Sequence, residues 1–149
     1  MEFKKILLAF DGSPLSVRGL ELGMELAQTF SAEIGVVTVI DPRDAITNVG
    51  GIRSEDLLKE MRLQAQHKLD EARAKAGPSH LAFDFLREGE PVSEIVGAAK
   101  EWGAELLILG SHPHSRLARL LYGSTAAGVM ERAPCPVLII PRPSVHASG

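Results

Sequence analysis

The sequence predicts an α/β domain in which helices cover both faces of a five-stranded parallel sheet, a three-layer α/β/α sandwich. Short apolar runs alternate with helix-like segments along the 149 residues, and this alternation is typical of parallel sheets with right-handed crossovers. Several runs are continuously apolar, as expected for strands buried on both faces. A chain of this length with 45% hydrophobic residues can bury a complete core without disulfides.

The first two strands are separated by one helix. Ile6–Phe10 is continuously apolar and ends at the turn sequence DGSP, as a buried strand does. In that turn Ser13 suits a helix N-cap and Pro14 the first helical position, and apolar residues then recur at helical spacing up to Phe30. Glu33–Ile40 is rich in β-branched residues and predicts the second strand.

The middle of the chain predicts a loop, two helices and a strand. Asp41–Arg53 has no periodicity, so we expect a loop that covers a site or stays mobile. From Ser54 an amphipathic helix runs to a Gly-Pro pair, and Leu81–Leu86 then alternates as a strand near the sheet edge with one wetter face. Pro91–Trp102 predicts a helix whose tryptophan belongs to the core rather than to a ligand platform.

The last third completes the alternation. Leu106–Leu109 predicts a fourth strand, Gly123–Arg132 a short helix and Val137–Ile140 a fifth strand between two prolines. We expect the domain to span residues 1–141 and residues 142–149 to form a flexible C-terminal tail.

Charge and composition argue against nucleic acid and membrane as partners. The chain has 16 Lys and Arg against 19 Asp and Glu, a formal charge of −3, whereas proteins that bind the phosphate backbone usually have a basic surface. No apolar run approaches the roughly 18 residues of a membrane span. The single cysteine, Cys135, suits a reducing compartment and reads as a packing residue rather than a nucleophile. We therefore expect a cytoplasmic protein.

Several motifs are absent from the sequence. The dipeptide Gly-Lys of a Walker phosphate loop does not occur, no two glycines have the spacing of a dinucleotide fingerprint, and G-x-S-x-G is missing. His112 and His114 have no further histidine or cysteine at ligand spacing, so no metal site is expected.

The loops after the first and fourth strands are the expected ligand site. Ligands of open α/β sheets bind outside the carboxyl ends of the strands, where the strand order reverses. These loops begin at Asp11 and Gly110, and Gly123-Ser124-Thr125 opens the helix that follows the second of them. Free N–H groups and hydroxyls at a helix start suit a phosphate. The same residues read equally well as a turn and a cap, and Asp11 alone reads as a turn carboxylate.

The segment that contains these residues resembles the signature of the universal stress protein family. The family pattern is usually written G-x2-G-x9-G-[ST], and the segment ends in APCPVLII, which is typical of the family's last helix-to-strand turn. KKILLAFDGSPLS, VVTVID and GEPVSEIVGAAKEWGAELLILGS resemble further parts of the family in the same order. The resemblance implies strand order 3-2-1-4-5, binding of ATP, or of AMP or ADP, with Mg²⁺ able to accompany ATP, and a homodimer formed through the last strand.

The resemblance also assigns roles to individual residues. Asp11 would meet the ribose or base with Ala9 nearby, Val39 would offer backbone contacts to adenine, and Gly110 would open the phosphate loop. Main-chain N–H groups and hydroxyls of the helix start would hold the phosphates. With His112 and Pro113 from the loop that the motif spans, the implied site comprises Ala9, Asp11, Val39, Gly110, His112, Pro113, Gly123, Ser124 and Thr125.

Three functions follow from these observations. The first is a universal stress protein that binds an adenine nucleotide as a regulatory ligand in the stress response, without a catalytic apparatus. The alternative is a homodimeric interaction protein of the same fold with a degenerate, non-binding site. A slow ATPase is the third, with Asp11 as the only carboxylate that the motifs bring near the ligand.

One position departs from the family pattern. Pro113 stands where the second glycine of G-x2-G is expected, and proline has no N–H donor and a fixed φ near about −65°. His112 and His114 can compensate as donors, more effectively when protonated, although exposed histidines in a loop need no ligand.

Replacing this proline tests whether it obstructs the phosphate loop. Pro113→Gly restores a donor and access to positive φ. One charge-assisted hydrogen bond to a phosphate should contribute about 1.5–3 kcal/mol to the binding free energy. Ordering the more flexible glycine backbone on binding should cost about 1 kcal/mol. We expect calorimetry to show ATP binding tighter by a few-fold to about tenfold, with a smaller gain for adenosine. Equal gains for both ligands would mean that the loop was merely loosened.

Overall fold

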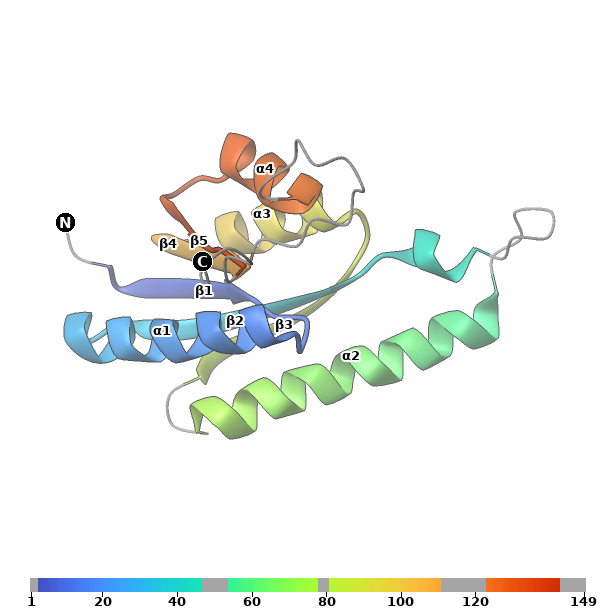
Figure 1. The fold of residues 1–149 in the computed structure, drawn as a ribbon, viewed down its shortest axis with the longest axis horizontal. Coiled ribbons are helices and arrows are strands. Elements are labelled where there is room, and N and C mark those ends of the chain that lie inside the picture. The colour runs from blue at the N-terminus through green and yellow to red at the C-terminus, as the bar shows by residue number, and fades with distance from the viewer. Residues whose placement is uncertain (1–2, 47–53, 78–80, 111–122, 143–149) are drawn as a thin grey trace, which may run out of the picture.

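The structure, a computed structural model, describes residues 3–46, 54–77, 81–110 and 123–142 (Figure 1). Strands and α-helices alternate along the chain, and one 3₁₀ helix, η1, follows the second strand. Their bounds are β1 (Lys5–Ala9), α1 (Pro14–Phe30), β2 (Glu33–Ile40), η1 (Pro42–Ala45), α2 (Glu55–Ala76), β3 (Leu81–Glu88), α3 (Pro91–Trp102), β4 (Leu106–Gly110), α4 (Gly123–Arg132) and β5 (Val137–Ile140).

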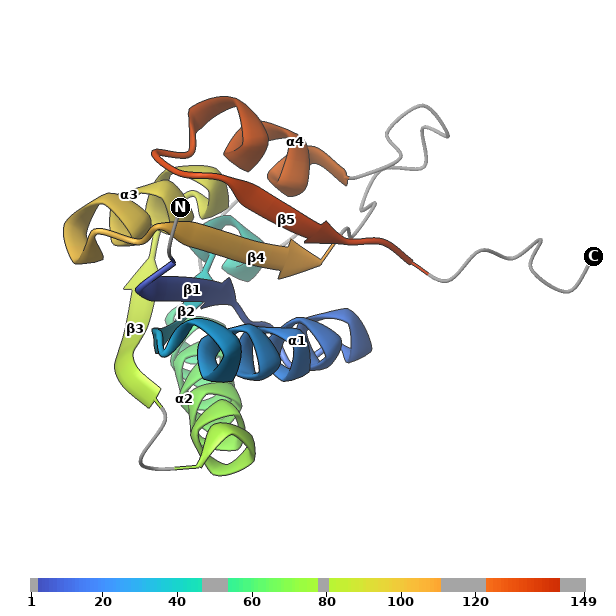
Figure 2. The same ribbon diagram turned by 90° about the vertical axis from the view of Figure 1, so that its left-hand side faces the viewer.

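The sheet has five parallel strands in the order β3-β2-β1-β4-β5, which confirms the predicted fold and strand order. Figure 2 shows α1 and α2 on one face of the sheet and α3 and α4 on the other. The chain winds outward from β1 to β3, crosses back to β4 and continues to β5. The direction of winding therefore reverses between β1 and β4.

Strand β1 lies at the centre of the sheet, and both of its faces are buried. Ile6 and Leu8 belong to the core beneath α1 and α2, whereas Leu7 belongs to the core beneath α3 and α4. All three side chains are at most 1% exposed. Burial on both faces, as predicted, explains why the sequence of this strand is continuously apolar.

Three helices begin at side-chain caps. The Ser13 Oγ accepts a hydrogen bond from the Ser16 N–H, and the Ser54 Oγ accepts one from the Leu57 N–H. Glu90 caps α3 with its carboxylate, and the hydrogen bonds that it accepts, chiefly from the Ser93 N–H, lower its pKa. These caps satisfy donors that a helix start leaves unpaired.

The structure departs from the sequence analysis after β2. The stretch that was expected to be irregular begins with η1, because Asp41 accepts a hydrogen bond from the Arg43 N–H at 3.0 Å and Pro42 has a preset φ at the first helical position. β1 begins one residue earlier than predicted, and Phe10 beyond its end is still buried. Of the expected C-terminal tail, residues 143–149 lie outside the described residues.

Strand β3 forms one edge of the sheet, as predicted, but its burial does not alternate cleanly. Phe83 is 49% exposed and Leu86 is 40% exposed, although they point to opposite faces. The ring of Phe83 stacks on Phe85 and meets Trp102 edge-on, with centroids 5.6 Å apart.

Trp102 lies in the core, as the sequence indicated, and it packs on the backbone of β2. A Cβ placed on Gly35 would stand 2.8 Å from the Trp102 ring, so a residue with a side chain would collide with it. Cys135 packs at the margin of the same core, and its half-burial raises the pKa of the thiol. This is consistent with a packing cysteine, although the residue is not fully buried.

The end of β1 is held by a buried hydroxyl of β2. The Thr38 Oγ1 donates a hydrogen bond of 2.9 Å to the Phe10 carbonyl, and the Phe10 N–H donates to the Val37 carbonyl at the same distance. Thr38 is only 3% exposed. The two bonds fix the backbone immediately before Asp11.

Thr38→Val tests this anchor, because it keeps the shape of the side chain and leaves the Phe10 carbonyl without its hydroxyl donor. We expect urea denaturation to show a loss of about 1–3 kcal/mol in the free energy of unfolding. Thr29→Val is the control, because the Thr29 hydroxyl bonds to the Glu25 carbonyl on the exposed face of α1. Equal losses in the two variants would contradict a special role of the buried hydroxyl.

Candidate functional site

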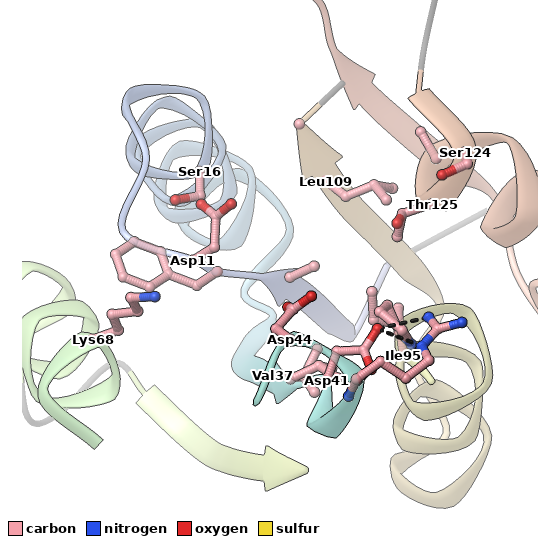
Figure 3. Close-up of a pocket in the computed structure, with 17 residues that line it drawn as sticks. Asp11, Ser16, Val37, Asp41, Asp44, Lys68, Ile95, Leu109, Ser124 and Thr125 are labelled. Atoms are coloured by element: carbon pink, nitrogen blue, oxygen red, sulfur yellow. Dashed lines mark hydrogen bonds and ion pairs between the residues drawn. The ribbon is translucent and has the colours of Figure 1, made fainter. Parts of the chain in front are cut away.

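A cavity of about 610 Å³ lies at the carboxyl ends of β1, β2 and β4 (Figure 3). It lies where the winding of the chain reverses, which is the position that open α/β sheets favour for ligands. Ala9, Val37 and Leu109 contribute apolar surface from the three strands, and the start of α4 contributes polar groups.

Residues that are far apart in the sequence meet in this cavity. Six of the nine residues of the predicted site line it, namely Ala9, Asp11, Val39, Gly110, Ser124 and Thr125. Gly123 is buried at the first position of α4 and does not belong to the lining. His112 and Pro113 lie outside the described residues.

The first turn of α4 presents hydroxyls and backbone donors. Gly123 has φ of +78°, a conformation that glycine adopts without strain. Ser124 is exposed and Thr125 is half-buried, and both line the cavity. Because the N–H groups of a first helical turn have no partners within the helix, this end of the cavity can donate several hydrogen bonds to an anion.

Asp11 is oriented by the turn that leads into α1. Its Oδ1 accepts a hydrogen bond of 2.9 Å from the Ser13 N–H, the arrangement of an Asx turn. The turn role that the sequence allowed is therefore present. It is compatible with ligand contact, because an ionised carboxylate has about four acceptor positions and Asp11 also lines the cavity.

The 3₁₀ helix adds an ion pair that sequence reasoning missed. The Arg43 Nη2 lies 2.6 Å from the Asp41 Oδ2, and the Arg43 Nε lies 3.0 Å from the same oxygen. The side-chain hydrogen bond from Arg43 lowers the pKa of Asp41, although partial burial acts in the opposite direction. Any stabilisation from this lowered pKa is present at neutral pH and is lost as the pH falls and Asp41 is protonated.

Other lining residues were also missed, for different reasons. Asp41 follows the second strand, so the rule about carboxyl ends would have found it. Lys68 lies within α2, and nothing in the local sequence distinguishes it from the other charged residues of that helix, which are exposed to solvent. The remaining lining residues that were not predicted are Phe10, Ser16, Val37, Asp44, Pro91, Ile95, Leu109 and Ala126.

The cavity contains more carboxylates than the motifs indicated. Asp41 and Asp44 line it together with Asp11, so Asp11 is not the only acidic group at the site. Within the described segments, no group of three or more histidine, cysteine, aspartate or glutamate side chains is arranged to hold a metal ion.

Comparison with known proteins decides the family. A profile of the universal stress protein family matches residues 2–141. The chain belongs to this family. The universal stress protein MJ0531 of Methanocaldococcus jannaschii is 30% identical over 148 residues, with 95% of this chain and 84% of that protein covered.

Several solved structures have the same architecture. The protein MJ0577 superposes with a TM-score of 0.80 at 26% identity, covering 97% of this chain and 99% of that one. A universal stress protein of Archaeoglobus fulgidus in complex with dAMP has a TM-score of 0.66 at 25% identity, covering 94% and 99%. A further universal stress protein, solved in complex with cAMP, has a TM-score of 0.64 at 25% identity, covering 94% and 98%.

Two neighbours of the same fold were solved with nucleotides that contain adenine.

Among the described helices, none combines the length and the apolar character that a membrane span requires.

Proposed function

We propose that this universal stress protein binds ATP, or the related AMP or ADP, as a regulatory ligand in the stress response. The observation that carries the proposal is the cavity at the reversal point of the sheet, where Asp11, Val39, Ser124 and Thr125 meet although they come from different parts of the chain. The complexes of two family members with cAMP and dAMP support the same class of ligand.

The chemistry of the cavity suggests how the nucleotide is oriented. The phosphates belong at the start of α4, because backbone donors and the hydroxyls of Ser124 and Thr125 suit an anion. The nucleoside then extends toward β1 and β2, where Ala9 and Val39 offer apolar contacts and Asp11 can accept a hydrogen bond from a hydroxyl or an amine. If ATP is the ligand, a Mg²⁺ ion would accompany it, coordinated by the phosphates.

The direct test is to identify what the protein carries. The full chain is purified without added ligand and denatured, and the released small molecules are analysed by mass spectrometry. We expect ATP, ADP or AMP. If the protein releases no nucleotide, and calorimetry with added ATP, AMP and adenosine shows no binding, a vestigial site is the correct interpretation.

Ser124→Ala tests the phosphate end. The described residues offer the Ser124 hydroxyl no hydrogen bond, so its removal should cost little stability. The loss of one hydrogen bond to a charged phosphate should weaken ATP binding by about tenfold and leave adenosine binding nearly unchanged. Asp11→Ala is the complementary variant, and its loss should be similar for ATP and adenosine, as calorimetry can measure.

Ser54→Ala is the matched control for this experiment. Ser54 caps α2 and is not part of the cavity lining, so the variant should lose about 1 kcal/mol of stability with ATP affinity unchanged. Unchanged ATP titrations for both Ser124→Ala and Asp11→Ala would contradict the assigned site.

We also propose that the chain forms a homodimer through β5. This strand is at the edge of the sheet, and its residues Val137, Leu138 and Ile139 are only half-buried. An apolar edge strand without a partner invites aggregation, and a second copy of the chain would cover it. The Leu107 N–H donates to the Pro136 carbonyl at 3.0 Å, so the parallel pattern turns the N–H groups of Val137 and Ile139 outward.

Ile139→Pro tests the dimer because it removes one outward donor and spares the hydrogen bonds to β4. We expect analytical ultracentrifugation to show a dimer for the wild type at micromolar concentration and a shift toward monomer for the variant. Ile139→Ala is the control, since it shortens the same side chain and keeps the donor. A monomeric wild type would exclude the proposal.

A further inference from the structure

One cation of the cavity has no role in the proposed phosphate site. Lys68 comes from α2 and lines the cavity on the wall opposite Ser124 and Thr125 (Figure 3). It is half-buried. No residue in the described parts of the chain forms a hydrogen bond or an ion pair with its ammonium group.

The stem of Lys68 lies against the turn that carries Asp11. A Cβ placed on Gly12 would lie 3.4 Å from the Lys68 Cγ, 3.8 Å from its Cδ and 3.9 Å from its Cε. Gly12 has φ of +81°, which glycine adopts without strain. The lack of a side chain at this position also leaves room for the Lys68 stem. Such packing buries the methylene groups and leaves the ammonium at the polar end free to reach a partner.

The position of Lys68 is fixed by the packing of α2. Ala65 and Leu69 are 3% and 2% exposed in the core, which sets the rotation of the helix. Toward β3, Arg73 forms an ion pair with Asp84, and the Arg62 Nη2 lies 2.9 Å from the Glu88 Oε1. Both ion pairs connect α2 to β3, so Lys68 extends into the cavity from a helix that is anchored to the sheet.

We propose that Lys68 is a further ligand-contacting residue that, together with Asp11, recognises the ribose hydroxyls of the bound nucleotide. This assignment rests on the proposed function. Each hydroxyl of a vicinal diol can donate one hydrogen bond and accept others. Asp11, when ionised, can only accept, and the Lys68 ammonium can only donate. The two groups therefore complement a diol and make the preferred ligand class a ribonucleotide with free 2′ and 3′ hydroxyls. This preference would set the chain apart from the neighbours solved with cAMP and dAMP, because each of those ligands lacks one of the two free hydroxyls.

The location of Lys68 argues against a role in holding phosphates. The helix start that suits an anion is on the other side of the cavity. Asp11, which would repel a phosphate, belongs to the turn on which the lysine stem packs. A group at this end of the cavity should therefore affect adenosine and ATP alike.

The test compares Lys68→Met with a matched control in the full chain. Methionine keeps an unbranched stem against Gly12 and removes the donor. Lys75→Met is the control, because Lys75 is exposed, lies on the same face of α2 about two turns away and is outside the cavity lining. Both variants remove one positive charge. Circular dichroism and urea midpoints establish that each is folded.

Calorimetry with adenosine, 2′-deoxyadenosine and 3′-deoxyadenosine gives the readout. Lys68→Met should weaken adenosine binding by about tenfold, and Lys75→Met by less than about twofold. At least one deoxy analogue should bind the wild type about tenfold more weakly than adenosine does, and Lys68→Met should weaken that analogue no further than about twofold. Lys68→Arg keeps a donor and should retain most of the affinity.

Three results would overturn the assignment. An equal loss for adenosine and both deoxy analogues would make Lys68 a base contact. A loss seen only with ATP, and reduced by salt, would make it a source of long-range attraction. No loss in a wild type that binds adenosine would remove Lys68 from the site. If the wild type binds neither adenosine nor ATP, the proposed function itself fails and the assignment falls with it.

Discussion

The burial of the middle of β1 between two helical layers is the constraint on which the arrangement of this protein depends. Ile6, Leu7 and Leu8 point to both faces of the central strand and are buried. Phe10, just beyond the strand, is buried as well, so the backbone polar groups there need partners within the protein. The Thr38 hydroxyl supplies one for the Phe10 carbonyl. The chain can leave the sheet only after that point, and it does so at the turn that orients Asp11.

The cavity follows from the same constraint. Helix α1 follows β1 and helix α4 follows β4, and the two helices lie on opposite faces of the sheet. The carboxyl ends of the two strands therefore lie at the reversal point of the sheet, where open α/β sheets bind ligands. The three carboxylates of the lining are not its only charged groups, because Arg43 pairs with Asp41. Helix α4 contributes Ser124, Thr125 and Ala126 to the lining but no acidic side chain.

Much of the fold could be predicted from the sequence, because its elements are encoded locally. Buried strands are continuously apolar, and Ser13 and Ser54 mark helix starts that the structure confirms. The 3₁₀ helix has only one turn and no apolar stripe, so periodicity could not reveal it. Lys68 was missed for another reason, since its relation to Gly12 exists only after α2 has packed on the sheet. The proximity of Asp44 to the cavity likewise depends on η1.

The contact between Gly35 and Trp102 has a consequence for how such sequences can diverge. Gly35 has no side chain, and the large ring of Trp102 occupies the space beside β2 that a side chain at position 35 would need. Neither residue can be exchanged freely on its own, because a larger residue at position 35 needs a smaller one at position 102, and a smaller ring leaves a void. In an alignment of relatives the two positions should therefore covary, with total volume conserved while the individual residues are not.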